Sequence, residues 1–262
     1  MTRAQAIACF IALVGYAVVC LSQTHYVLLT TGEVAAAATT TTTTTTTTTI
    51  PDIPTNGLAA YWPFNGDMLD YGLYGYGNDM TGVATATNGV SGVTNTAYYF
   101  NGSNTVLLRT VGDGNINTMI QYTAMAWVNA KTSAVVQQGI LVNKTSPNYR
   151  YALAIERSGS VFKIGQWDPT GAAWRYGTTN MQYETWNHIA VTHDGSTVTI
   201  YGNGLLQSSA SCTMKSPNDE LWIGGWSAAG TFPFFGTIDE VRIYNRVLSS
   251  SEVYGVVQKI EP

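Results

Sequence analysis

The sequence predicts an all-β domain, a sandwich or a barrel, and three observations support this. From about Leu58 onward, short runs of alternating apolar and polar residues recur, separated by Gly, Asn, Asp and Ser. Runs of this period and spacing are typical of antiparallel sandwiches and barrels. The 262 residues include 26 Gly, 16 Tyr and 7 Trp, which favours strands and turns. Only 11% are charged, against about 25% in average soluble chains, which argues against disorder or a coiled coil.

The expected strands follow one another closely along the chain. They are LAAYWPF (58–64), TAYYFNGSNTVLL (96–108), YTAMAWVNA (122–130), GILVNK (139–144), RYALAIE (150–156), VFKIGQW (161–167), TWNHIAVTHDG (185–195), STVTIYGNG (196–204), ELWIGGW (220–226) and FFGTIDEVRIYNR (234–246). Asp194-Gly195 and Asn203-Gly204 are hairpin turn signals. Only LSSSEVYGVVQ (248–258) has helical character, with serines that can cap it and Glu252 in the first turn.

The N-terminal part has a different composition and divides into two segments. Residues 1–24 combine Arg3 with an apolar run, which is the layout of a secretory signal peptide. If it is not cleaved, the same stretch is a marginal single-span membrane anchor. Residues 25–56 contain four alanines and eleven consecutive threonines, and such a tract has no apolar face to bury. We interpret it as a disordered, O-glycosylated stalk or as a slippage repeat without function, and the folded domain as residues 57–262.

Charge and cysteine content exclude several classes of partner and site. The net charge is −4 and the basic residues are scattered, so the chain has no basic stripe for nucleic acid. Cys212 is the single cysteine beyond the apolar N-terminal stretch, and no Cys-x-x-Cys pair is present to hold zinc. His188 and His193 lie five apart on one expected strand, so we expect them on opposite faces and not as a metal pair.

Four blocks together resemble a laminin-G-like domain of the concanavalin-A-like lectin/glucanase jelly-roll superfamily. They cover about residues 57–255 and are GLAAYWPFNGD (57–67) with GYGNDMTG (75–82), AYYFNGSNTVLL (97–108), TWNHIAVTHDGSTVTIYGNGLL (185–206) and FFGTIDEVRIYNRVLSSSEV (234–253). The last two blocks, with Trp-x-His and Gly-x-Ile-Asp-Glu-Val-Arg-Ile-Tyr, are specific in combination. The resemblance implies a two-sheet antiparallel jelly-roll sandwich with a short C-terminal helix, in agreement with the strand pattern.

Asp239 is the acidic residue with the clearest predicted role. By period 2 it shares a strand face with Val241 and Ile243, which marks that face as the core. A buried carboxylate needs a cation or several hydrogen-bond donors. The resemblance implies a structural calcium ion bound by Asp239 and by backbone carbonyls, including one near Gly102. The alternative is that Asp239 accepts backbone N–H bonds or pairs with an arginine.

The sequence does not favour catalysis. The glucanases of the same superfamily carry Glu-x-Asp-x-x-Glu on one strand, and this spacing is absent here. A Gly-x-Ser-x-Gly nucleophile elbow is also absent. A glycoside hydrolase is therefore the least favoured function.

Aromatic residues between glycines provide the candidate binding sites. Tyr71, Tyr74 and Tyr76 cluster in one Gly-rich loop; Trp167, Trp174 and Tyr176 flank a second, and Trp226 and Phe232 flank a third. Flat aromatic rings suit the C–H faces of sugars. Aromatic residues also fill sandwich cores, but a position in a loop favours binding, because binding residues are often found in loops. Asn101 and Asn143 begin glycosylation sequons.

The leading interpretation is a non-catalytic extracellular recognition module for glycans or cell-surface glycoproteins. It would be secreted, or tethered to a membrane through its N-terminus. The alternative is a structural surface protein whose jelly roll mediates assembly, since one fold hosts many functions.

Overall fold

The structure is a computed structural model that describes residues 50–73, 77–103, 105–110, 116, 118–145, 148–214, 220–226 and 231–260. The predicted signal peptide or anchor and most of the predicted stalk lie outside these residues, as do Tyr74 and Tyr76. Within the described part, no helix is both long and apolar enough to cross a membrane.

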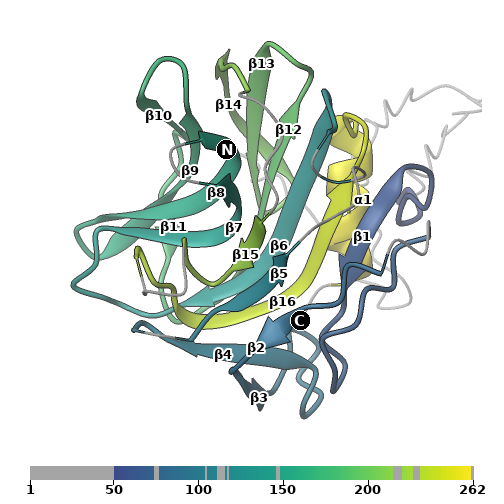
Figure 1. The fold of residues 1–262 in the computed structure, drawn as a ribbon, viewed down its shortest axis with the longest axis vertical. Helices are drawn as coiled ribbons and strands as arrows, with labels where there is room; N and C mark the ends of the chain where they lie inside the picture. The colour runs from purple at the N-terminus through teal and green to yellow at the C-terminus, as the bar shows by residue number, and fades with distance from the viewer. Residues whose placement is uncertain are drawn as a thin grey trace, which may run out of the picture. The chain divides into compact units, whose positions relative to one another are not determined.

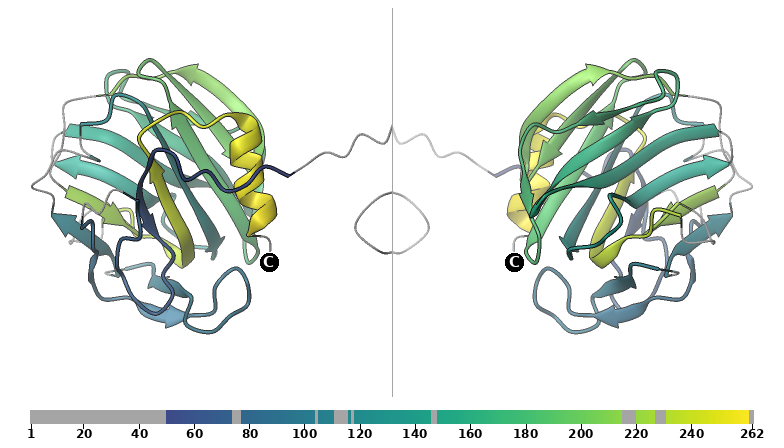
Figure 2. Two further views of the ribbon diagram at one scale, coloured as in Figure 1. Left: turned by 90° about the vertical axis from the view of Figure 1, so that its right-hand side faces the viewer. Right: turned by 90° about the vertical axis from the view of Figure 1, so that its left-hand side faces the viewer.

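The described strands form two antiparallel sheets that face each other, as Figures 1 and 2 show. In the first sheet the order is β14 (Leu205–Ser211), β13 (Thr197–Gly202), β12 (Trp186–His193), β6 (Tyr122–Ala130), β16 (Phe235–Tyr244), β4 (Ala97–Asn101) and β3 (Thr85–Thr87). The opening strand β1 (Leu58–Trp62) also pairs with β16, so the two ends of the domain meet in one ladder.

The second sheet carries the candidate site. Its order is β10 (Ala173–Tyr176), β9 (Val161–Asp168), β8 (Asn148–Ser158), β7 (Gln137–Thr145), β15 (Glu220–Ile223), β5 (Leu107–Thr110) and β2 (Thr81–Gly82), and β11 (Met181–Gln182) pairs with β9. The two-sheet antiparallel jelly-roll sandwich predicted from the sequence is confirmed.

Apolar side chains from both sheets meet between them. Trp62, Phe100, Phe162 and Phe234 are fully buried there. Fully burying one large apolar side chain contributes about 1.5–3 kcal/mol, so this layer is the main source of stability. Both hairpin turns predicted at Asp-Gly and Asn-Gly form, and Asn203 and Gly204 adopt positive φ angles of 50° and 77°.

The predicted helix is α1 (Ser250–Lys259), and it lies on the outside of the first sheet (Figure 2). Ser249 caps it: the Ser249 hydroxyl accepts from the Glu252 N–H, and the Glu252 carboxylate accepts from the Ser249 N–H at 2.8 Å. Such a reciprocal cap satisfies two helix-end donors. Val253 and Val256 then pack on Tyr201 and Tyr244 of the sheet.

The folded domain begins before residue 57, so the predicted end of the stalk is placed too late. Ile53 packs against the cluster beneath α1, and the Pro54 carbonyl accepts a hydrogen bond from the Tyr244 hydroxyl at 3.0 Å. The Asn56 carbonyl accepts from Arg246 at 2.9 Å. These contacts attach residues 53–56 to the domain. The sequence did not predict this, because the prolines and the asparagine that follow the threonine tract are typical of a linker.

The sequence-based placement of Asp239 is wrong because β16 contains a bulge. Asp239 pairs with Trp127, yet the next β6 pair is Arg242 with Met125, so the register shifts between them. Glu240 absorbs the shift with a φ of +54°. A bulge inserts a residue and reverses the alternation beyond it. Ile238 and Val241 therefore face the core, while Asp239 lies with Trp127 on the opposite side of the sheet.

Candidate functional site

The candidate site begins with the hairpin of β9 and β10. Trp167 lies at the end of the expected strand 161–167, whereas Trp174 and Tyr176, which the sequence placed beside a Gly-rich loop, lie on a strand that was not predicted; residues 169–172 form the turn. Trp174 pairs directly with Trp167, and Tyr176 pairs with Gly165. Cross-strand partners project from the same side of a sheet, so the hairpin presents the rings together.

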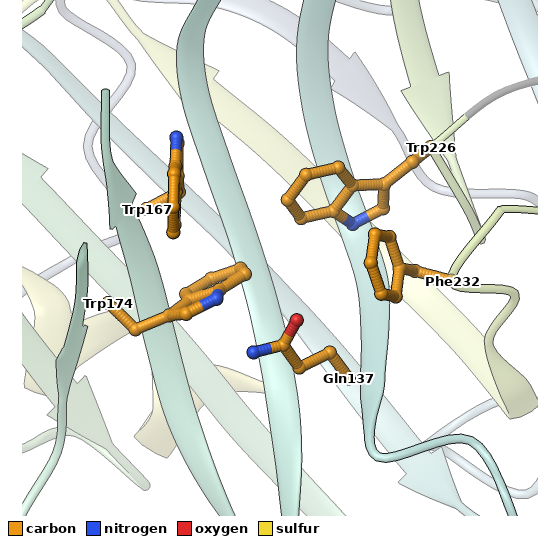
Figure 3. Close-up of a pocket in the computed structure, with 5 residues that line it drawn as sticks. All are labelled: Gln137, Trp167, Trp174, Trp226 and Phe232. Atoms are coloured by element: carbon orange, nitrogen blue, oxygen red, sulfur yellow. The ribbon is translucent and has the colours of Figure 1, made fainter. Parts of the chain in front are cut away.

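Five side chains surround an open hollow of about 200 Å³ on this side of the second sheet. They are Gln137, Trp167, Trp174, Trp226 and Phe232 (Figure 3). The ring centroids of Trp167 and Trp174 are 5.5 Å apart, those of Trp174 and Trp226 are 5.6 Å apart, and those of Trp226 and Phe232 are 4.8 Å apart. The rings form a continuous chain of contacts. The two aromatic pairs that the sequence placed in separate loops therefore build one site.

Glycines in the strands make room for the rings. A Cβ atom on Gly139 would lie 2.3 Å from the Trp226 indole. A Cβ atom on Gly165 would lie 3.0 Å from the Tyr176 ring and 3.1 Å from the Trp174 ring. Real Cβ atoms do not approach ring atoms as closely as the first of these distances. The rings thus lie directly over the backbone of β7 and β9, and a larger residue at Gly139 would displace Trp226.

A polar group borders the hollow beside Gln137. The Gln137 amide donates to the Glu156 carboxylate at 3.1 Å, and the Tyr176 hydroxyl donates to the same oxygen. Tyr176 in turn stacks on Trp174, with ring centroids 6.0 Å apart. Burial, together with the hydrogen bond to Glu156, raises the pKa of Tyr176, so its hydroxyl remains a neutral donor. Sequence reasoning did not find Gln137 or Glu156.

A family model described as the concanavalin A-like lectin/glucanases superfamily (Laminin_G_3) matches residues 100–254. The chain belongs to this superfamily. The family predicted from the sequence is thereby confirmed. No curated protein sequence matches the chain.

Solved structures show the same fold at low sequence identity. Domain 4 of AbnA, a GH43 extracellular arabinanase from Geobacillus stearothermophilus solved in complex with arabinotriose, aligns with a TM-score of 0.59 and 22% identity, covering 77% of this chain and 98% of that one. The binding domain of botulinum neurotoxin serotype G aligns with a TM-score of 0.56 and 16% identity, covering 77% of this chain and 51% of that one. The binding domain of Paraclostridial Mosquitocidal Protein 1 aligns with a TM-score of 0.60 and 15% identity, covering 78% of this chain and 52% of that one. The chain thus spans about half the length of these two toxin domains.

Asp239 and Gly102, the residues that the resemblance to the concanavalin A-like superfamily implies for calcium, do not lie together. Gly102 follows β4 beside Phe235, which is four residues from Asp239 along β16. At about 3.3 Å per strand residue the separation is roughly 13 Å, whereas calcium ligands lie about 2.3–2.6 Å from the ion. The two residues therefore do not fit one ion. Among the described residues, no three His, Cys, Asp or Glu side chains gather as around a metal.

The carboxylate of Asp239 is buried and accepts backbone hydrogen bonds. It accepts from the N–H of Val90 at 2.9 Å and from the N–H of Glu240 at 2.7 Å, one at each oxygen. This is the alternative that the sequence left open. Nearby His188 is also fully buried, against Trp127, and burial lowers its pKa to about 3, so it is a neutral structural residue.

Calcium at Asp239 alone stays a prediction, and chelation tests it. If the ion binds, saturation at a hundredfold excess over Kd stabilises the fold by about 2.7 kcal/mol. Chelation should then lower the melting temperature by roughly 5–10 °C, and added calcium should restore it. Asp239→Asn should abolish this response, because a neutral amide is a weak ligand for calcium. If chelator leaves the melting curve unchanged, calcium is not bound at Asp239, and the two hydrogen bonds alone stabilise its buried carboxylate.

The pKa of Asp239 predicts a pH dependence of stability in metal-free buffer. Burial raises this pKa from 3.8 to about 7, against the lowering effect of the Val90 and Glu240 N–H bonds. Between pH 4 and 7 the folded state therefore holds a proton that the unfolded chain has released. The free energy of unfolding should fall by about 2–4 kcal/mol as pH rises through this window.

Urea unfolding of wild type and Asp239→Asn at a series of pH values measures this effect. The variant should lack the fall above pH 5. Glu252, whose pKa the Arg246 hydrogen bond lowers from 4.5 to about 2, changes stability mainly below about pH 5 and does so equally in both proteins. The same slope in both proteins would assign the pH dependence to another group.

The two sequons differ in access. Asn101 is exposed at the end of β4, where its side-chain oxygen accepts the Ser103 N–H at 3.0 Å. Asn143 is fully buried in β7 and donates to the Glu220 carbonyl at 3.0 Å, so a glycan there would not fit the folded sheet. Of the tyrosine loop, Tyr71 is exposed and donates to Asp67 at 2.9 Å, while Tyr74 and Tyr76 lie outside the described residues.

Proposed function

We propose that this protein is a non-catalytic recognition module that binds glycans at the aromatic hollow. The observation that carries the proposal is the ring of Trp167, Trp174, Trp226 and Phe232 around an open space with Gln137 at its edge. Ligand sites combine mainly apolar and aromatic walls with a few polar groups that fix orientation. Indole faces suit the C–H faces of a sugar ring, and the Gln137 amide and Glu156 carboxylate suit its hydroxyls.

The structural neighbours are consistent with this role. One is an arabinanase domain solved with arabinotriose, and two are toxin binding domains. Because all of them are below 25% identical to this chain, they support the fold, and the proposal rests on the hollow itself. The absence of the Glu-x-Asp-x-x-Glu pattern supports binding without hydrolysis. The apolar run in residues 1–24 supports export, where glycans are accessible.

A glycan array probed with the full chain tests the proposal. Hits should be confirmed by titration while indole fluorescence is recorded, because a ligand in the hollow contacts three tryptophans. We expect saturable binding, a fluorescence change and intact glycan after prolonged incubation. An array without binding would overturn the proposal. Self-association of such a non-binding protein would favour the assembly function instead.

A further inference from the structure

The rings of the hollow are arranged as walls rather than as a flat platform. The interplanar angle is 65° between Trp167 and Trp174, 53° between Trp174 and Trp226, and 60° between Trp226 and Phe232. Neighbouring rings are thus steeply inclined to one another around the open centre seen in Figure 3. Ring faces carry the negative side of the aromatic quadrupole, and several faces around one point attract a cation.

A carboxylate adds negative charge at the edge of these walls. Glu156 is one hydrogen bond from the hollow through Gln137, and Tyr176 binds the same oxygen. Among the described residues, the other Glu156 oxygen, Oε1, accepts no hydrogen bond. Lys163 lies opposite Glu156 in the β8–β9 ladder, but no ion pair joins them within the described part of the chain. A ligand ammonium group is a suitable partner for this carboxylate.

The hollow is also small. Sites for drug-sized ligands usually measure about 300–1,000 Å³, so about 200 Å³ suits a single sugar residue or its substituent. An acidic sugar would bring its carboxylate close to Glu156 and to the ring faces, and like charges at short range disfavour binding.

We propose, building on the glycan-binding function above, that the hollow selects a sugar residue that carries a positively charged amino group. The ammonium group lies against the faces of Trp167, Trp174 and Trp226 and faces Glu156. N-acetylated and acidic sugars lack this charge or carry the opposite one, and they bind more weakly.

Two oligosaccharides of equal length isolate the charge, one of glucosamine and one of N-acetylglucosamine. Each is titrated into the full chain by calorimetry in mildly acidic buffer, in which the amine is protonated. A cation over desolvated aromatic faces gains affinity of about five- to thirtyfold, and we expect the glucosamine oligosaccharide to bind more tightly by this factor.

Three variants separate charge from hydrogen bonding. Glu156→Gln keeps an acceptor for Tyr176 and Gln137 but removes the charge, and it should abolish most of the preference for the amine. Tyr176→Phe keeps the charge and should retain the preference. Lys163→Gln removes the neighbouring positive charge and should strengthen binding of the amine.

Equal or tighter binding of the acetylated oligosaccharide would overturn the selectivity while the glycan-binding function stands. Binding of neither oligosaccharide, when the array shows another ligand, would overturn it as well. If the array shows no ligand at all, the proposed function itself fails.

Discussion

Replacing Trp174 by alanine is expected to weaken binding of the glycan identified on the array by about ten- to hundredfold. Trp174 contacts Trp167, Tyr176 and Trp226, so it connects the two aromatic pairs of the hollow. Stacking on one aromatic ring is worth about 1–3 kcal/mol for nucleic-acid bases, and we take a sugar to lie within that range. The loss of the ring also frees its neighbours to rotate, which adds to the effect. Titration calorimetry measures the change in Kd.

The stability of the same variant provides the internal control. Trp174 is only half-buried and lies on an edge strand. The melting temperature of Trp174→Ala should therefore be at most a few degrees below that of the wild type. Tyr254→Ala removes a partly exposed aromatic residue from α1, which packs on the other sheet, and should leave Kd unchanged. Wild-type affinity in Trp174→Ala would exclude the hollow as the binding site. A collapse in melting temperature would instead make Trp174 a core residue.

The sequence predicted the fold well because its strands alternate and its turns carry Asp-Gly and Asn-Gly. Even the helix cap at Ser249 followed from local chemistry. The strands it missed are short or lack alternation. β10 has no fully buried position, and β14 is largely exposed, so neither carries the apolar period that marks a strand. Missing β10 left Trp174 and Tyr176 in an apparent loop.

The candidate site was predicted only in part because it depends on contacts between distant segments. Trp167 and Trp174 were found as aromatic residues around a turn, but Phe232 joins them only through the order of strands in the sheet. Gln137 and Glu156 meet through the β7–β8 register, which sequence alone does not fix. One available signal was glycine within strands: Gly139 begins and Gly165 interrupts an apolar run where a ring approaches the backbone.

Asp239 shows a different limit. Strict alternation along β16 placed it in the core, and one bulged residue, Glu240, reversed this. The bulge could not be predicted from the sequence, because residues other than glycine rarely adopt a positive φ and Glu240 continues the alternating pattern. The expectation that Asp239 is buried is nevertheless met, because Val90 and its neighbours cover the other face of the sheet.

Loss of the Arg242 charge is expected to produce the largest change in stability. The Arg242 side chain is 4% exposed, pairs with Glu240 at 2.5 Å, and lies over the Tyr61 ring at 4.1 Å from the centroid. Tyr61 donates to Glu240 at 2.9 Å, which links β1 to β16. Arg242→Met keeps the bulk of the side chain but leaves the Glu240 charge unpaired. Breaking a buried pair in this way costs about 3–5 kcal/mol.

For a domain of this size the expected loss corresponds to a melting temperature lower by roughly 6–20 °C, measurable by calorimetry. Lys259→Ala is the control, because it removes an exposed ion pair between Lys259 and Asp52. The Lys259 side chain is 41% exposed and the Asp52 side chain 96% exposed. Such an exposed pair is worth at most about 1 kcal/mol. The double variant Arg242→Met with Glu240→Gln should recover most of the loss, since neither position then carries a charge. If the single and double variants are equally unstable, the loss stems from packing on Tyr61, and the ion pair is not the cause.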